Sequence, residues 1–177
     1  MQRIRVAVVA GLACALAGPA AGPAMAEVPL ADCAAAAGVY LTRNSLPDSD
    51  GTIMQTRSLI TFSTEGLATR NDSDQDGGVE GTPFGEGRGV WRCDSVEGTT
   101  ARLSAVILNF GYSPEGETPT LARMDYSGEV DGTTGVLRLQ AKLVFLPIDS
   151  DPFAGTTDQQ AVTVDIVGQK VAVPPAP

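Results

Sequence analysis

The chain contains no histidine among its 177 residues. This absence excludes catalytic centres of the Ser-His and Cys-His types, and it excludes metal sites that depend on imidazole ligands. Basic residues are also scarce, with 12 lysines and arginines against 21 aspartates and glutamates. A nucleic-acid-binding protein needs a basic surface, so no nucleic-acid partner is expected. Aromatic residues make up only 5% of the chain, so a core would be filled mainly by aliphatic side chains.

Residues 1–26 have the features of a secretory signal peptide. Arg3 and Arg5 precede a short apolar run, Val6–Leu16, and the small-residue triplet Ala24-Met25-Ala26 follows. A basic end, an apolar stretch and a small-residue cleavage site are typical of exported proteins. Cleavage at this triplet would leave 10 basic and 21 acidic side chains, a net charge of −11. The sequence therefore predicts an acidic protein of the periplasm or the extracellular space.

The signal-like segment leaves one alternative. Cys14, in Gly11-Leu12-Ala13-Cys14, loosely resembles a bacterial lipoprotein box, so lipid anchoring at Cys14 is a second possibility. No later apolar run approaches the roughly 18 residues of a membrane-spanning helix, so no transmembrane segment is expected. An apolar content of 43% is enough to build a folded core.

The rest of the chain predicts short strands. Apolar and polar residues alternate in short runs, and clusters of Gly, Asp, Pro and Thr separate these runs. Residues 30–37, rich in alanine, predict a short helix, with an extended leader as the alternative. We expect one β domain over residues 27–172 and an extended Pro-rich tail over residues 173–177. The predicted strands are Val39–Arg43, Arg57–Ser63, Leu67–Asn71, Gly87–Cys93, Ala101–Phe110, Leu121–Asp131, Gly135–Leu146 and Ala161–Val171.

About eight strands in sequence, joined by short turns, predict an antiparallel meander. A meander must cover or abolish its edges, and closure into a barrel does so. One register can also be predicted. A four-residue loop at residues 132–135 pairs Glu129 with Arg138 and Asp125 with Lys142, whereas a two-residue loop places two basic residues opposite each other. Opposite charges across two strands stabilise the pairing, so the four-residue loop is favoured.

Several short elements occur in a familiar order. These are Leu59-Ile60-Thr61-Phe62 with Glu65-Gly66, then Gly87-Arg88-Gly89-Val90-Trp91, the strand at residues 101–110, and Val130-Asp131-Gly132. This order resembles a group of small secreted bacterial proteins with a lipocalin-like (calycin-type) β-barrel. The resemblance covers roughly residues 38–153. It implies an eight-stranded barrel that binds a small apolar molecule, with Trp91 at its closed end, and it carries over no catalytic residues.

Cys33 and Cys93 are the two cysteines that remain after the predicted signal peptide. An exported protein meets an oxidising compartment, where two cysteines most simply form a disulfide. The alternative is a catalytic thiol. That thiol would have no histidine to activate it, and Arg92 alone is a weak activator.

Residues 72–77, Asp-Ser-Asp-Gln-Asp-Gly, resemble the opening of a calcium-binding loop. Asp72, Asp74 and Asp76 would be the ligands. The twelfth position is Pro83, where such a loop needs a glutamate, and no helix flanks the segment. The alternative is a solvated hairpin loop in which Asp and Gly serve turn geometry.

The predicted function is binding of a small hydrophobic ligand inside the barrel. The alternatives are a structural protein with a solid core and a cofactor-free isomerase or cyclase. The inward positions are expected to be nearly all apolar, which argues against an enzyme, and Asn109 is the exception, expected at a strand end in contact with solvent. No motif for a cofactor or nucleophile is present, so no cofactor is expected. The predicted lining is Ile60, Phe62, Leu103, Ile107, Met124, Tyr126, Leu139, Leu143 and Phe145, with small residues Ala105, Gly128 and Ala141 leaving room.

Overall fold

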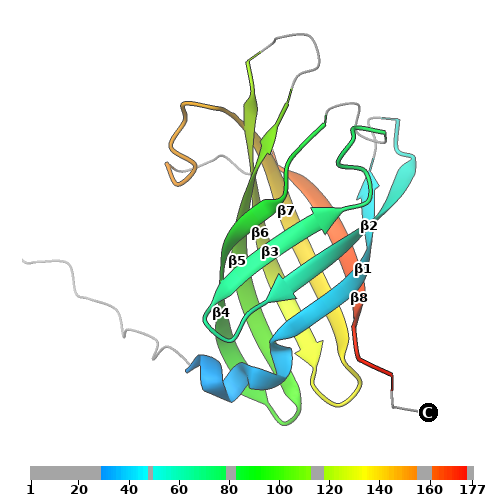
Figure 1. Ribbon diagram of the computed structural model, residues 1–177, viewed down its shortest axis with the longest axis vertical. Helices are drawn as coiled ribbons and strands as arrows, with labels where there is room; N and C mark the ends of the chain where they lie inside the picture. Colours follow the sequence, from blue (N-terminus) through cyan, green and yellow to red (C-terminus); the bar gives the residue numbers. More distant parts are fainter. Residues whose placement is uncertain (1–28, 48–49, 79–82, 113–117, 155–160, 175–177) are drawn as a thin grey trace, which may run out of the picture.

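The computed structural model describes residues 29–47, 50–78, 83–112, 118–154 and 161–174. These residues form an all-β structure in which each strand pairs antiparallel with the next (Figure 1). Pairing of the last strand with the first closes the sheet into a barrel, so each of the eight strands has a neighbour on both sides. The strands are β1 Gly38–Pro47, β2 Ile53–Phe62, β3 Leu67–Asp72, β4 Gly87–Glu97, β5 Thr100–Gly111, β6 Thr120–Asp131, β7 Val136–Pro147 and β8 Val162–Lys170.

The predicted fold class is therefore confirmed, and each predicted strand corresponds to one of these eight. Side-chain alternation explains why the strands were recognisable. In β7, Leu137, Leu139 and Ala141 are buried, while Arg138 and Gln140 between them are exposed. A period of two places one set inside the barrel and the other in solvent.

The register between β6 and β7 is also as predicted. Glu129 pairs with Arg138 and Asp125 with Lys142 on the outer face, and Arg123 lies opposite Val144. The backbone N–H of Gly135 donates to the carbonyl of Asp131 at 2.8 Å and closes the four-residue loop. Cross-strand charge pairs thus identified the correct loop length from the sequence.

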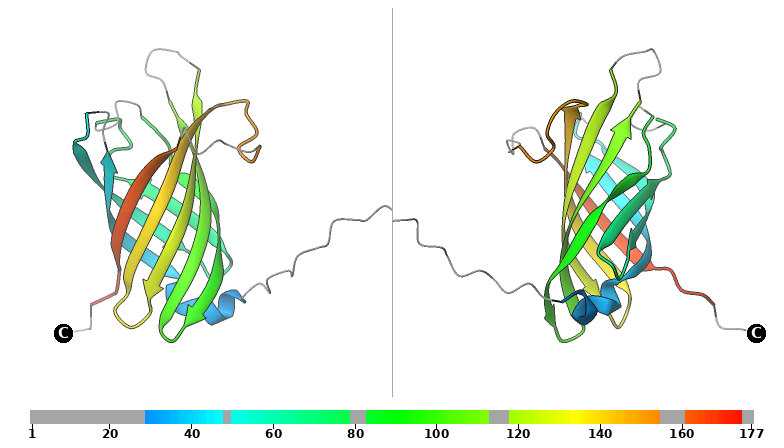
Figure 2. Two further views of the ribbon diagram at one scale, coloured as in Figure 1. Left: turned by 180° about the vertical axis from the view of Figure 1, so that it is seen from behind. Right: turned by 60° about the vertical axis from the view of Figure 1, so that its left-hand side comes forward.

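The two ends of the barrel differ. A short 3-10 helix, η1 Leu30–Ala36, lies against one end together with the β2–β3, β4–β5 and β6–β7 turns (Figures 1 and 2). We call this the disulfide end, because Cys33 of η1 is bonded there to Cys93 of β4. The other end, which we call the loop end, carries the longer connections that follow β1, β3, β5 and β7 (Figure 1).

The predicted helix at residues 30–37 is confirmed, in 3-10 form. No described helix has the length and apolar character needed to cross a bilayer. Residues 1–28, with the predicted signal peptide and Cys14, lie outside the described residues, as do residues 175–177 of the tail. The described part of the tail is extended, and Val173 is exposed.

Candidate functional site

The disulfide end of the interior is filled by aromatic side chains. Tyr40 packs on Phe62 with ring centroids 6.0 Å apart, and Phe62 packs on Trp91 at 5.5 Å. The Tyr40 hydroxyl donates to the carbonyl of Ala36 in η1 at 2.8 Å, and the Trp91 indole N–H donates to the carbonyl of Ser63 at 2.8 Å. Burial raises the pKa of Tyr40 to about 12. These contacts close this end, and Trp91 lies in the core there as the resemblance implied.

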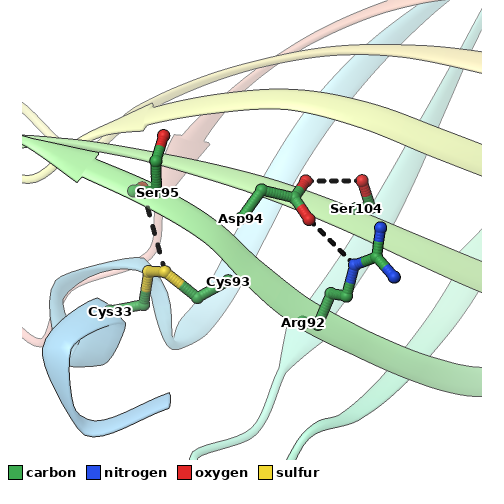
Figure 3. Close-up of a disulfide and its surroundings, with 6 residues drawn as sticks. All are labelled: Cys33, Arg92, Cys93, Asp94, Ser95 and Ser104. Atoms are coloured by element: carbon green, nitrogen blue, oxygen red, sulfur yellow. Dashed lines mark hydrogen bonds and ion pairs between the residues drawn. A yellow bond between two sulfur atoms is a disulfide. The ribbon is translucent and has the colours of Figure 1, made fainter. Parts of the chain in front are cut away.

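The predicted disulfide between Cys33 and Cys93 is confirmed, and it fixes η1 across the same end (Figure 3). Both cysteines are buried. Arg92, considered as a possible activator of a free thiol, instead pairs with Asp94 on the outer face at 2.8 Å. Asp94 also accepts a hydrogen bond from the Ser104 hydroxyl (Figure 3). Cys93 therefore has a structural role as half of a disulfide, not the role of a reactive thiol.

Toward the loop end, the interior is polar. Thr42 and Asn44 of β1 and Thr56 and Ser58 of β2 are all buried. The Asn44 amide donates to the Ser58 hydroxyl at 2.6 Å and to the Thr56 hydroxyl at 3.0 Å, while the Thr42 hydroxyl donates to the Asn44 side-chain oxygen at 3.0 Å. Each of these groups thereby has a protein partner in place of water.

Arg70 of β3 extends this network across the barrel. Its Nη2 lies 2.6 Å from Oδ1 of Asp72, which also accepts from the Ser58 hydroxyl. Its Nη1 donates to the Tyr126 hydroxyl of β6 at 2.9 Å and contacts the sulfur of Met124. The Arg70 and Asp72 side chains are only 7% and 2% exposed. We call the residues Thr42, Asn44, Thr56, Ser58, Arg70, Asp72 and Tyr126 the interior polar network.

The protonation states in this network follow from burial and pairing. Burial raises the pKa of Tyr126, so its hydroxyl stays protonated at neutral pH. Burial alone would lower the pKa of Arg70, but its partners Tyr126 and Asp72 favour the charged form and outweigh that effect. Arg70 is therefore a buried cation with its partners already in place.

This network corrects the expectation that inward positions are nearly all apolar. On β1 and β2, Leu41 and Leu59 lie on the exposed outer face, and polar residues occupy inner positions. The inner face of β2 was predicted correctly through Ile60 and Phe62, but the polar residues Thr56 and Ser58 on the same face were not recognised as buried. Phe62 was expected inside the barrel. Phe62 pairs with Ala68, so Ala68 shares the inner face, and by alternation Arg70 and Asp72 on β3 lie on that face as well.

Two further buried polar side chains lie at the loop end. Asp74 follows β3 and is 4% exposed, and Asn109 near the end of β5 is 6% exposed. Within the described part of the chain, neither Oδ2 of Asp74 nor Oδ1 of Asn109 has a hydrogen-bond partner. Burial, followed by repulsion from Asp72, raises the pKa of Asp74. Asn109 was predicted to lie at a strand end in solvent, and it is instead buried.

A backbone hydrogen bond and a β-bridge connect the chain segments that carry these two side chains. The N–H of Phe84 donates to the carbonyl of Gln75, the neighbour of Asp74, at 3.0 Å. Phe84 in turn forms a β-bridge with Gly111, two residues beyond Asn109. The segment after β3 is thus connected to the end of β5.

The predicted lining residues fall into two groups. Eight are buried in the barrel core, and whether they contact a ligand stays a prediction. Phe145 is different, because it is 56% exposed. The pairing of β7 with β8 ends at Leu143, so Phe145 lies beyond the closed part of the barrel. The eight buried residues are Ile60, Phe62, Leu103, Ile107, Met124, Tyr126, Leu139 and Leu143.

Gly128 does not leave room in the way that was expected. A Cβ added there would lie 2.1 Å from the carbonyl oxygen of Arg138 and 2.8 Å from Cα of Leu139. The missing side chain therefore permits a close approach of β7 to β6.

The three aspartates of the calcium-like segment do not converge. Asp72 is paired with Arg70, and Asp74 is buried. Asp76 accepts a hydrogen bond from the backbone N–H of Gly78 in a turn. Over the described ranges, no group of three acidic or cysteine side chains is arranged to hold a metal ion. The alternative of a fully solvated loop does not hold, because the Asp72 side chain is only 2% exposed and Asp74 only 4%.

Among the described residues, the interior contains one buried cation, Arg70, whose hydrogen bonds are already made, and two buried acceptor oxygens without a partner. Arg70 already donates to Asp72 and Tyr126, so it is poorly placed to take a further anion. Asp74 and Asn109 each retain an acceptor oxygen without a described partner, although both residues are almost completely buried. Comparisons of the chain with protein-family models, with curated proteins and with solved structures found no match in any of the three.

Proposed function

We propose that the protein is an exported, lipocalin-like barrel that binds a small molecule in the interior toward the loop end. The observation that carries this proposal is the buried polar network, with Asp74 and Asn109 beside it. A buried ion pair such as Arg70–Asp72 adds little stability compared with apolar side chains of the same size. A barrel with a purely structural role would need no such interior, whereas ligand sites commonly combine an apolar lining with a few fixed polar groups.

The direction of entry follows from the difference between the two ends. Tyr40, Phe62 and Trp91 fill the disulfide end, and the Cys33–Cys93 bridge fixes η1 across it. The polar side chains of the interior lie toward the loop end. A ligand would therefore enter between the connections at the loop end.

The apolar part of the ligand would lie against β5–β8. The inner positions of these strands are mainly aliphatic, with Ile107, Met124 and Leu143 among the buried residues. The polar positions are concentrated on β1–β3. This division favours a ligand with an apolar body and a polar group, rather than a purely hydrophobic one.

Export is supported by the signal-like residues 1–26 and by the disulfide, a bond typical of oxidising compartments. Mass spectrometry of the mature chain tests it. A chain that begins at Glu27 supports the proposal, and a lipid on Cys14 would support the anchored alternative.

Native mass spectrometry of freshly purified protein tests the binding function, because a bound ligand adds its mass. A second test is titration with a neutral environment-sensitive dye. Ala122→Trp places a bulky ring at a buried position beside Asn109 and should abolish dye binding. Val90→Trp on the exposed outer face is the matched control and should not. A folded protein that binds neither ligand nor dye would favour the solid-core alternative.

The polar interior also favours the enzymatic alternative more than the sequence did. Asp74 combines burial with a raised pKa, as a general acid or base requires. If native mass spectrometry yields a ligand, incubation of that ligand with the protein in D2O tests this candidate. Deuterium uptake that is lost in Asp74→Asn would identify proton transfer by Asp74.

A further inference from the structure

Next to the interior polar network lies one carboxylate, that of Asp74, with a buried oxygen that no described residue bonds. Arg70 and Asp72 compensate each other at 2.6 Å, and Tyr126 is neutral. Asp74 is the next carboxylate along the chain. Its Oδ2 has no hydrogen-bond partner among the described residues, although only 4% of the residue is exposed. Burial of an unpaired carboxylate costs free energy of folding unless a positively charged group lies beside it.

Asn109 offers a second unused acceptor at the same end. Its Oδ1 is buried and has no partner within the residues that the structure describes. Gln75, Phe84 and Gly111 are connected through backbone hydrogen bonds and a β-bridge, which ties the chain beside Asp74 to the chain beside Asn109. A single chemical group that donates hydrogen bonds and carries positive charge would match both acceptors.

We propose that Asp74 and Asn109 form a subsite for a protonated amine, and that the ligand of this barrel is an organic ammonium ion with an apolar body. This inference rests on the proposed ligand-binding function. An ammonium group has three N–H donors and neutralises the Asp74 carboxylate. A carboxylate ligand would instead meet the Asp74 charge, with Arg70 already paired to Asp72. A hydroxyl group would satisfy the acceptors but leave the charge uncompensated.

Isothermal titration calorimetry of the mature protein with three probes of equal chain length tests this inference. The probes are octylamine, octan-1-ol and octanoate, each measured at physiological ionic strength so that surface charges are screened. The amine is expected to bind at least about tenfold more tightly than the alcohol, because charge-assisted hydrogen bonds to buried groups are strong. Octanoate is expected to bind most weakly.

Two substitutions identify the subsite. Asp74→Asn should remove the preference for the amine over the alcohol. Asp76→Asn is the matched control, because it makes the same change in net charge at an exposed turn and should preserve the preference. If Asp74→Asn fails to fold, Asn109→Leu replaces it. This variant removes an acceptor that lacks a partner, so it should fold and bind the amine less tightly.

The outcomes separate this inference from the function on which it rests. If wild type binds the amine and the alcohol equally, and Asp74→Asn does not change this, the amine subsite is overturned. That result would indicate that water bonds Asp74, and the proposed binding function would still stand. A preference lost equally in Asp74→Asn and Asp76→Asn would also overturn the subsite, because it would reflect net charge. Binding of none of the three probes by folded protein would overturn both proposals.

Discussion

The buried pair Arg70–Asp72 can be tested by a double-mutant cycle. Arg70→Met leaves the Asp72 carboxylate buried without its cation, and Asp72→Asn leaves the Arg70 guanidinium without its anion. The combined variant Arg70→Met with Asp72→Asn removes both charges. In that variant the hydroxyl of Ser58 can still donate to the amide oxygen introduced at position 72, and the hydroxyl of Tyr126 can still donate to the sulfur of Met124.

The expected magnitudes follow from burial. Because the Arg70 and Asp72 side chains are only 7% and 2% exposed, water cannot solvate the charge that remains. Each single substitution is expected to lower the free energy of unfolding by about 3–5 kcal/mol. The double substitution is expected to lower it by only about 1–2 kcal/mol, so the cycle departs from additivity by at least about 4 kcal/mol.

Urea unfolding followed by tryptophan fluorescence measures these values. Trp91 is the only tryptophan of the chain and is 4% exposed, so unfolding changes its surroundings. Arg88→Met is the control, because the Arg88–Glu86 pair is exposed and should contribute less than about 1 kcal/mol. If the double variant loses as much stability as the two single variants together, the network is needed for stability. The inference that a polar interior indicates binding would then lose its support.

Two further predictions concern the disulfide and the pH dependence of stability. Replacing Cys33 and Cys93 by serine opens a loop of 60 residues and should lower the free energy of unfolding by about 4 kcal/mol. Thiol titration of the denatured, non-reduced mature protein should find no free thiol, and two would contradict the bridge. Burial raises the pKa of Asp74 above 3.8, so the folded state binds a proton at Asp74 more tightly than the unfolded state does. The free energy of unfolding therefore falls as the pH rises from 3.8 through the raised pKa. Asp74→Asn should therefore be more stable than wild type by about 1 kcal/mol at neutral pH, with a smaller difference near pH 4, and parallel urea-unfolding curves against pH would contradict this.

The strands were predictable because their signals are local. Alternation in β7 separates Leu137 and Leu139 from Arg138 and Gln140, and a period of two needs no knowledge of the rest of the chain. The register of β6 with β7 followed from charges directly opposite each other across a short loop. The disulfide was predictable from the number of cysteines, because the two that follow the predicted signal peptide allow a single intramolecular pairing.

The candidate site depends on contacts that are distant in sequence. Arg70 meets Tyr126 across the barrel, 56 positions further along the chain. Both faces of β3 mix apolar and polar residues, so composition does not distinguish inside from outside. One face carries Leu67, Thr69 and Asn71, and the other carries Ala68, Arg70 and Asp72. The loop after β2 leads into the observed register, in which the hydroxyl of Ser63 accepts from the N–H of Leu67 and the carbonyl of Gly66 accepts from the N–H of Trp91.

By itself, the sequence determined an acidic all-β chain of eight strands, one hairpin register and one disulfide, because each depends on neighbouring residues or on counting. Only the tertiary structure decided which face of β1 and of β3 lies inside the barrel, and therefore that Arg70 and Asp72 are buried as a pair. It also decided that Asp74, which the sequence placed either in a calcium-like loop or in a solvated turn, is buried. The physical reason is closure: once β8 pairs with β1, the inner face of every strand is fixed by all its neighbours together.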